Sequence, residues 1–167
     1  MRESVITSQE ELVTTTLSSM TNEDSAAKDL ERSSEQWLAW LAEVLARRRD
    51  PPGSAAYALW DALEEWFASD DFAASPLAAA VVAPPDGRGP AAHAVLVRHR
   101  QATRRLLEEL ARSAGARDPD ALASQLLTLI EGAMAGALID RHPQVARHAR
   151  ELTRIAIAGV ASRPRRR

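Results

Sequence analysis

Residue types that often carry catalysis are present, but their spacing does not assemble a reactive site. The four histidines fall into two pairs with a spacing of six residues: His93 and His99, and His142 and His148. That spacing places the two rings of a pair on different faces of a helix. There is no cysteine, and no HExxH zinc motif, G-x-S-x-G elbow or glycine-rich phosphate loop occurs. The adjacent acids Glu64 and Glu65 diverge around a helix and cannot act as a pair. We therefore expect no enzyme, no metal site and no cofactor.

Tryptophan is the more informative residue type. Four of the seven aromatic residues are tryptophan, and all four lie between residues 37 and 66. Large aromatic side chains beside small ones can leave an apolar cavity between helices, where the ligands of helical bundles bind. The alternative is that they fill a solid core. The first interpretation predicts a site for a small, mostly apolar effector, lined by Trp37, Trp40, Leu41, Trp60, Leu63, Phe67, Ile130 and Met134.

The elements that must position these residues are predicted to be helices. Alanine, leucine, glutamate and arginine abound, and no window alternates as a strand does. We expect an all-α antiparallel bundle, with a polar loop at residues 21–32. Along the helix expected from Pro90 to Gly115, the core line is Val95, Ala102, Leu106 and Leu110. The helices are expected at residues 8–20, 34–49, 54–69, 76–83, 90–115, 118–140 and 143–160.

Charge and amino-acid composition divide the chain into three parts. Residues 1–36 hold three basic residues against eight acidic ones, whereas the remainder holds 18 against 15. We predict a polar acidic segment at residues 1–32 with one short helix, a helical ligand-binding and dimerisation domain at 33–161, and a basic tail at 162–167. No signal peptide and no apolar run of membrane length is recognised, and Glu131 and Asp140 argue against a bilayer span. We expect a cytoplasmic protein with no membrane partner.

The stretch from Asp118 to Val160 carries more apolar surface than one amphipathic helix pair needs. Each of its two helices shows two apolar stripes, where an ordinary surface helix shows one. Gly132 and Gly136 each cost about 1 kcal/mol relative to alanine inside a helix, so they need a packing reason. We predict a dimer through a four-helix bundle, and tight packing within one chain is the alternative. The predicted interface residues are Leu126, Leu129, Gly132, Ala133, Gly136, Ala149, Leu152 and Ala156.

Four stretches together resemble the C-terminal half of TetR-family (tetracycline-repressor-type) transcriptional regulators. Residues 8–12 are similar to the serine-lysine-glutamate-x-leucine that follows the recognition helix of that family. Residues 37–41, 62–67 and 118–133 are similar to helix-packing patterns of its C-terminal domain. The resemblance covers residues 33–161 and, more weakly, 8–20. It implies a ligand pocket within the bundle and a dimer through the last two long helices.

The chain departs from the family pattern in two places. Ala73, Ala74 and Ser75 stand where many relatives carry arginine-glycine-cysteine, so the ligand class is not carried over. Only seven residues precede Ser8, whereas a helix-turn-helix head needs about fifty, and the acidic first segment has the wrong sign for phosphate contact. We expect a homodimer, or a heterodimer with a full-length relative. DNA binding is expected only if a helix-turn-helix lies upstream of this start.

Overall fold

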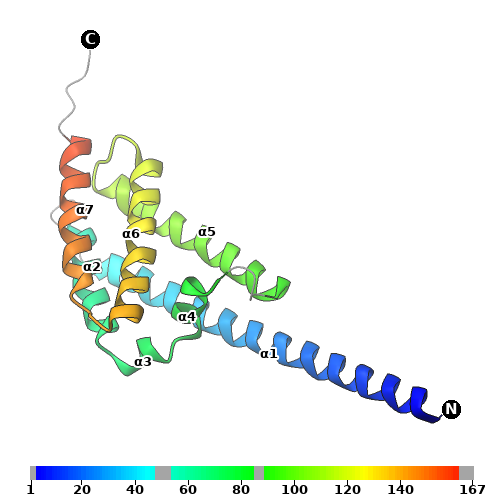
Figure 1. Cartoon of the computed structure of the whole chain (residues 1–167). Coiled ribbons are helices and arrows are strands. Elements are labelled where there is room, and N and C mark those ends of the chain that lie inside the picture. The colour runs from blue at the N-terminus through cyan, green and yellow to red at the C-terminus, as the bar shows by residue number, and fades with distance from the viewer. Residues whose placement is uncertain (1–2, 48–53, 85–88, 162–167) are drawn as a thin grey trace.

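The computed structural model describes residues 3–47, 54–84 and 89–161, and the side chains of 22–47, 54–84 and 89–158. Within these ranges the chain is helical and contains no strand, so the all-α prediction is confirmed. Seven helices are described, α1 to α7 (Figure 1). The C-terminal part of α1 and helices α2 to α7 pack around one core, while the N-terminal half of α1 extends away from them (Figure 1).

Helix α1 runs unbroken from Glu3 to Arg47, and the loop predicted at residues 21–32 is therefore wrong. The prediction rested on polar composition, but no glycine or proline occurs in this range to stop a helix. The boundary drawn at residue 32 falls inside this helix. The bundle-facing residues of α1 also begin earlier than expected, because its buried positions recur every three or four residues along one seam: Ala27, Leu30, Ser34, Trp37, Leu41 and Val44.

Three helices follow, α2 (Ser54–Phe67), α3 (Asp70–Ala73) and α4 (Pro76–Val82), and short turns join them. Each of the two turns ends in a serine N-cap. The Ser69 hydroxyl accepts a hydrogen bond from the Phe72 amide at 3.3 Å, and Ser75 accepts from the Ala78 amide at 3.2 Å. The caps define where α3 and α4 begin, and the Ser75 hydroxyl lies 3.5 Å from the Ser33 hydroxyl of α1.

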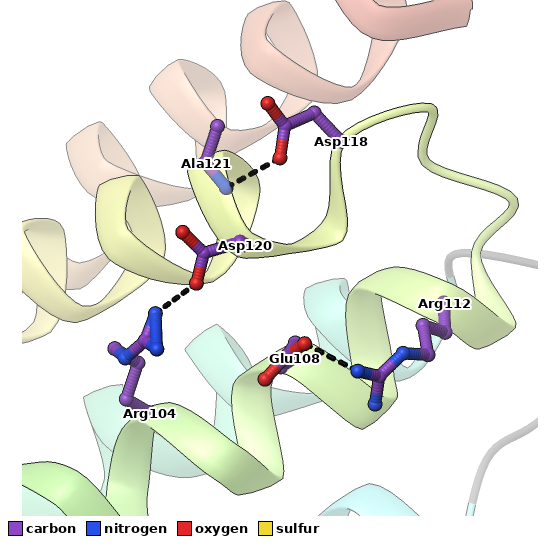
Figure 2. Close-up of polar contacts among 6 residues, drawn as sticks. All are labelled: Arg104, Glu108, Arg112, Asp118, Asp120 and Ala121. Carbon is purple, nitrogen blue, oxygen red and sulfur yellow. Dashed lines mark hydrogen bonds and ion pairs between the residues drawn. The ribbon is translucent and has the colours of Figure 1, made fainter.

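Helices α5 (Pro90–Ser113) and α6 (Pro119–Asp140) pack against each other and are joined by a turn at Gly115, whose φ of 74° suits glycine. As predicted, Asp118 caps α6, accepting from the Ala121 amide at 3.0 Å (Figure 2). Figure 2 also shows the ion pair that joins Arg104 of α5 to Asp120 in the first turn of α6. A carboxylate there is favoured by the positive end of the helix dipole.

The core face of α5 differs from the predicted line. Val95 and Leu110 are buried as expected, but Leu106 is only half-buried and the neighbouring Leu107 is fully buried. Two polar residues, His99 and Thr103, lie on the same buried seam. The sequence pattern missed them because it assigned the core from apolar residues alone.

Helices α6 and α7 (Val145–Ala161) form an antiparallel hairpin, turning at Arg141 with a left-handed φ of 52°. Helix α7 also packs along α2. By length and composition α6 is apolar enough to cross a membrane, contrary to the expectation that no such run exists. Eight of its residues are buried, and the helix packs against α4, α5 and α7 of the same chain.

Candidate functional site

Most of the residues predicted to line an effector cavity pack into the core. Trp60 is 1% exposed, and its indole Nε1 donates to the Thr153 hydroxyl at 2.8 Å. Six of the eight predicted residues belong to one contiguous buried cluster without lining the groove described next: Leu41, Trp60, Leu63, Phe67, Ile130 and Met134. These side chains therefore form part of the core of the bundle.

The other two, Trp37 and Trp40, line a groove of about 750 Å³ between α1 and the α2–α3–α4 segment. We call it the tryptophan groove. Its volume lies within the range of small-molecule sites. The groove is lined by Asp29, Arg32, Ser33, Gln36, Trp37, Trp40, Trp66, Asp71, Ala74, Ser75 and Pro76.

Three of the residues that line the tryptophan groove are tryptophans in contact with one another, and the last of them contacts the buried Phe72. The Trp37 and Trp40 ring centroids lie 6.0 Å apart, and Trp40 lies 5.9 Å from Trp66, which in turn contacts Phe72 edge-on at 4.9 Å. These are favourable distances for tilted and edge-to-face pairs. Trp40 and Trp66 are half-buried, so part of each indole is open to the groove.

Trp37 differs from Trp60 in its polar atom. Its Nε1 is buried and has no hydrogen-bond partner among the residues that the structure describes. A buried donor without an acceptor costs about 1–3 kcal/mol. A tryptophan beside the groove therefore carries a buried, unsatisfied polar group, which is uncommon in a core built for stability alone.

Three charged residues line the tryptophan groove, two acidic and one basic. Arg32 is paired with Asp29 at 3.0 Å, one turn away on α1. Asp71, in the first turn of α3, makes no ion pair or side-chain hydrogen bond within the described part of the chain. With Arg32 neutralised, the groove presents one net negative charge beside the indole rings.

A second, smaller cavity of about 290 Å³ lies between α4, α5 and α6. His99 lines it, and its Nδ1 lies 2.9 Å from the Ser34 hydroxyl of α1, while its Nε2 lies 3.5 Å from the Thr103 hydroxyl. Burial lowers the pKa of His99 to about 4, so the ring is neutral at pH 7. Arg100 and Glu131 pair across the same cavity at 3.2 Å, and burial raises the pKa of Glu131.

The predicted interface residues of the α6–α7 hairpin divide into two groups. Leu126, Ala133 and Ala149 are buried within one chain, and this part of the prediction is corrected. The reason is that α4, α5 and α7 cover α6 on more than one side, so its first apolar stripe belongs to the chain's own core. Leu129, Gly136 and Ala156 are half-buried, while Gly132 and Leu152 are exposed.

The exposed members lie on an apolar surface that we call the outer hairpin face. Leu152 is 52% exposed and Ile155 59%, and the sequence had not singled out Ile155. A Cβ added at Gly132 would meet nothing within 4 Å, whereas one at Gly136 would meet Val145 of the same chain at 3.2 Å. Gly132 therefore faces open space and Gly136 serves packing inside the chain. The outer hairpin face is formed by Ser124, Gln125, Thr128, Leu129, Leu152, Ile155 and Ala156, with Gly132 one turn further along α6.

Among the described residues, no three histidine or acidic side chains are grouped as a metal site would require. The two cavities and the outer hairpin face instead present aromatic and apolar side chains with a few charges. No family model, no curated protein and no solved structure matches this chain.

Proposed function

We propose that this chain is the sensing and dimerising part of a TetR-like transcriptional regulator. The observation that carries the proposal is the outer hairpin face. Leu152 and Ile155 are more than half exposed on α7, which packs against α6, where the Cβ position of Gly132 is open. Exposed apolar patches on a water-soluble protein mark interaction sites, and a second copy of the same hairpin is self-complementary about a two-fold axis.

The proposed partner arrangement is a four-helix bundle made from α6 and α7 of two chains. Gly132 allows a partner backbone to approach α6 closely, because no side chain stands between them. A full-length relative with the same hairpin would form the corresponding heterodimer. Contact with DNA then requires a helix-turn-helix, either upstream in a longer chain or on such a partner.

In this proposal a small, mostly apolar effector binds in the tryptophan groove rather than in the core. The groove lies between the long helix α1 and the α3–α4 turn. A ligand that prefers one relative position of these elements shifts the population of the dimer toward it, by as much as its affinities for the two positions differ. In a full regulator, α1 connects such a change to the DNA-binding head.

Sedimentation equilibrium at micromolar concentration tests the dimer. We expect the unaltered chain to sediment as a dimer, and Leu152→Glu and Ile155→Glu each to shift it to monomer, because a buried unpaired carboxylate is strongly disfavoured. Val97→Glu is the matched control. Val97 is an equally apolar, 42% exposed residue on α5, outside the outer hairpin face. A monomeric unaltered chain, or three variants that behave alike, would overturn the proposed dimer.

A second candidate function is a helical interaction module with a filled core and no ligand. The packing of Trp60, Leu63 and Met134 in one buried cluster favours it. A thermal-shift screen of small apolar and amphipathic molecules separates the two proposals. Stabilisation that is lost on changing groove residues supports the sensor, whereas a dimer that no small molecule stabilises supports the interaction module.

A further inference from the structure

The charge pattern of the tryptophan groove carries an inference about the chemistry of its ligand. Of its three charged residues, Asp29 and Arg32 neutralise each other at 3.0 Å. Asp71 is left as the one lining charge without an ion-pair partner within the described residues. Both Trp40 and Trp66 are half-buried and lie 5.9 Å apart along the same wall.

Indole faces and a free carboxylate select the same kind of guest. The face of an indole carries negative potential and attracts cations, tryptophan more strongly than the other aromatic side chains. An anion would face these rings and Asp71, and the single arginine of the groove is already paired. A neutral guest could at most donate a hydrogen bond to Asp71, whereas a cation also gains the attraction between opposite charges. A cation with an apolar body fits both the rings and the charge.

We propose that the tryptophan groove binds an organic cation with an apolar or aromatic body, such as a quaternary ammonium or phosphonium compound. Its charge is placed near Asp71, and its body lies against Trp40 and Trp66. The volume of about 750 Å³ holds a molecule with several aromatic rings. Only the role of this ligand as an effector rests on the proposed function. Binding itself does not require the outer hairpin face.

Two probes of nearly the same shape and opposite charge test the sign of the site. Isothermal titration with tetraphenylphosphonium and with tetraphenylborate compares a cation and an anion that share four phenyl rings. We expect the cation to bind at least about tenfold more tightly, and tryptophan fluorescence to change on its binding. Equal or tighter binding of the anion, or no binding of the cation at millimolar concentration, would overturn the proposal.

Substitutions at adjacent positions test the residues. Asp71→Asn is expected to weaken binding of the cation about fivefold, the effect of one partly exposed charge pair. Asp70→Asn is the matched control: it removes a carboxylate from the same first turn of α3, but Asp70 does not line the groove. It should leave the affinity within about twofold. Equal effects of the two variants would overturn the role of Asp71.

Arg32→Gln provides a test with the opposite sign. Removing the arginine frees Asp29, so the groove becomes more negative and the cation should bind a few-fold more tightly. If the groove selected anions through Arg32, the variant would bind tetraphenylborate more weakly and the cation no more tightly. That result would overturn the proposal. Sedimentation of the same samples reports the dimer independently, so failure of cation binding and failure of the proposed dimer are distinguishable.

Discussion

Trp60 and Trp37 lie in two regions of the bundle that differ in how completely they are packed. Trp60 is closed in between α2 and α7, and its N–H donates to Thr153 at 2.8 Å. Trp37 lies on α1 beside the tryptophan groove, and its buried N–H lacks a partner among the described residues. The difference teaches that the same residue type fills a satisfied core on the α2–α7 side and borders an open groove on the α1–α3–α4 side.

The largest expected effect comes from removing the packed tryptophan. Trp60→Ala should lower the free energy of unfolding by about 3–5 kcal/mol, because it leaves a large cavity and an unpaired hydroxyl on Thr153. Trp40→Ala is the comparison, since this side chain is half-exposed in the groove wall and should lose less than half as much. Urea denaturation followed by circular dichroism measures both. Equal losses would show that the two sides are packed alike.

Breaking only the hydrogen bond of Trp60 should have a smaller effect. Thr153→Val keeps the shape of the side chain but removes the acceptor, leaving the indole N–H buried without a partner. We expect a loss of about 1–3 kcal/mol in the same denaturation experiment. Ser113→Ala at the end of α5 is the control, because its hydroxyl only donates to the Leu110 carbonyl of its own helix. If neither variant changed the free energy of unfolding, the hydrogen bond of Trp60 would contribute nothing to stability. The Trp60 and Trp37 sides would then not differ in this respect.

The buried His99, which contacts Trp37 at 5.1 Å, makes the groove side sensitive to acid. Its pKa of about 4 in the folded chain lies below the ordinary value of 6.5, so the unfolded chain takes up the proton first as pH falls. Stability should be complete above pH 6.5 and be lost as the pH falls toward 4. Between pH 7 and pH 5 we expect this group to account for about 2 kcal/mol.

The measurement is the free energy of unfolding at the two pH values for the unaltered chain and for His99→Gln. The variant should lose less on acidification, while effects of Glu131 and other carboxylates are common to both and cancel in the difference. His93→Gln, an exposed position on the same helix, should behave as the unaltered chain does. A pH dependence that His99→Gln leaves unchanged would contradict the assignment.

The positions of many helices could be predicted from helix-capping and helix-breaking residues in the sequence. Asp118-Pro119 precedes α6, and Gly115 follows α5. The continuity of α1 was missed because polar composition was given more weight than the lack of glycine and proline. His99 and Thr103 were missed because a polar residue on a buried seam looks like a surface residue in sequence. Its neighbours on other helices decide that it is buried.

The residues of the candidate sites were harder to predict from the sequence than the helices. Trp37 and Trp40 were predicted as ligand-binding residues and do line the tryptophan groove, but Asp71 and Ser75 could not be foreseen. They reach the groove through the packing of α4 against α1, where Ser33 and Ser75 meet across 42 positions of the chain. Helical periodicity describes one helix at a time. Periodicity identified two apolar stripes on α6, but it could not show which of them the other helices of the same chain cover. For this reason Leu126 was predicted at the dimer interface, although it is buried in the core of its own chain.

The smallest expected effect tests whether surface charges hold the packed α2–α7 side together. Arg150 of α7 pairs with Asp61 of α2 at 2.8 Å and lies 5.7 Å over the Tyr57 ring. Both charged side chains are more than 40% exposed, so Arg150→Gln should lower the free energy of unfolding by less than about 1 kcal/mol, and less again in high salt. Arg154→Gln, whose partner Glu151 lies on the same helix, should be nearly neutral. A larger loss for Arg150→Gln, unaffected by salt, would mean that this guanidinium acts through packing on Tyr57, and that the α2–α7 side depends on its rim as well as on Trp60.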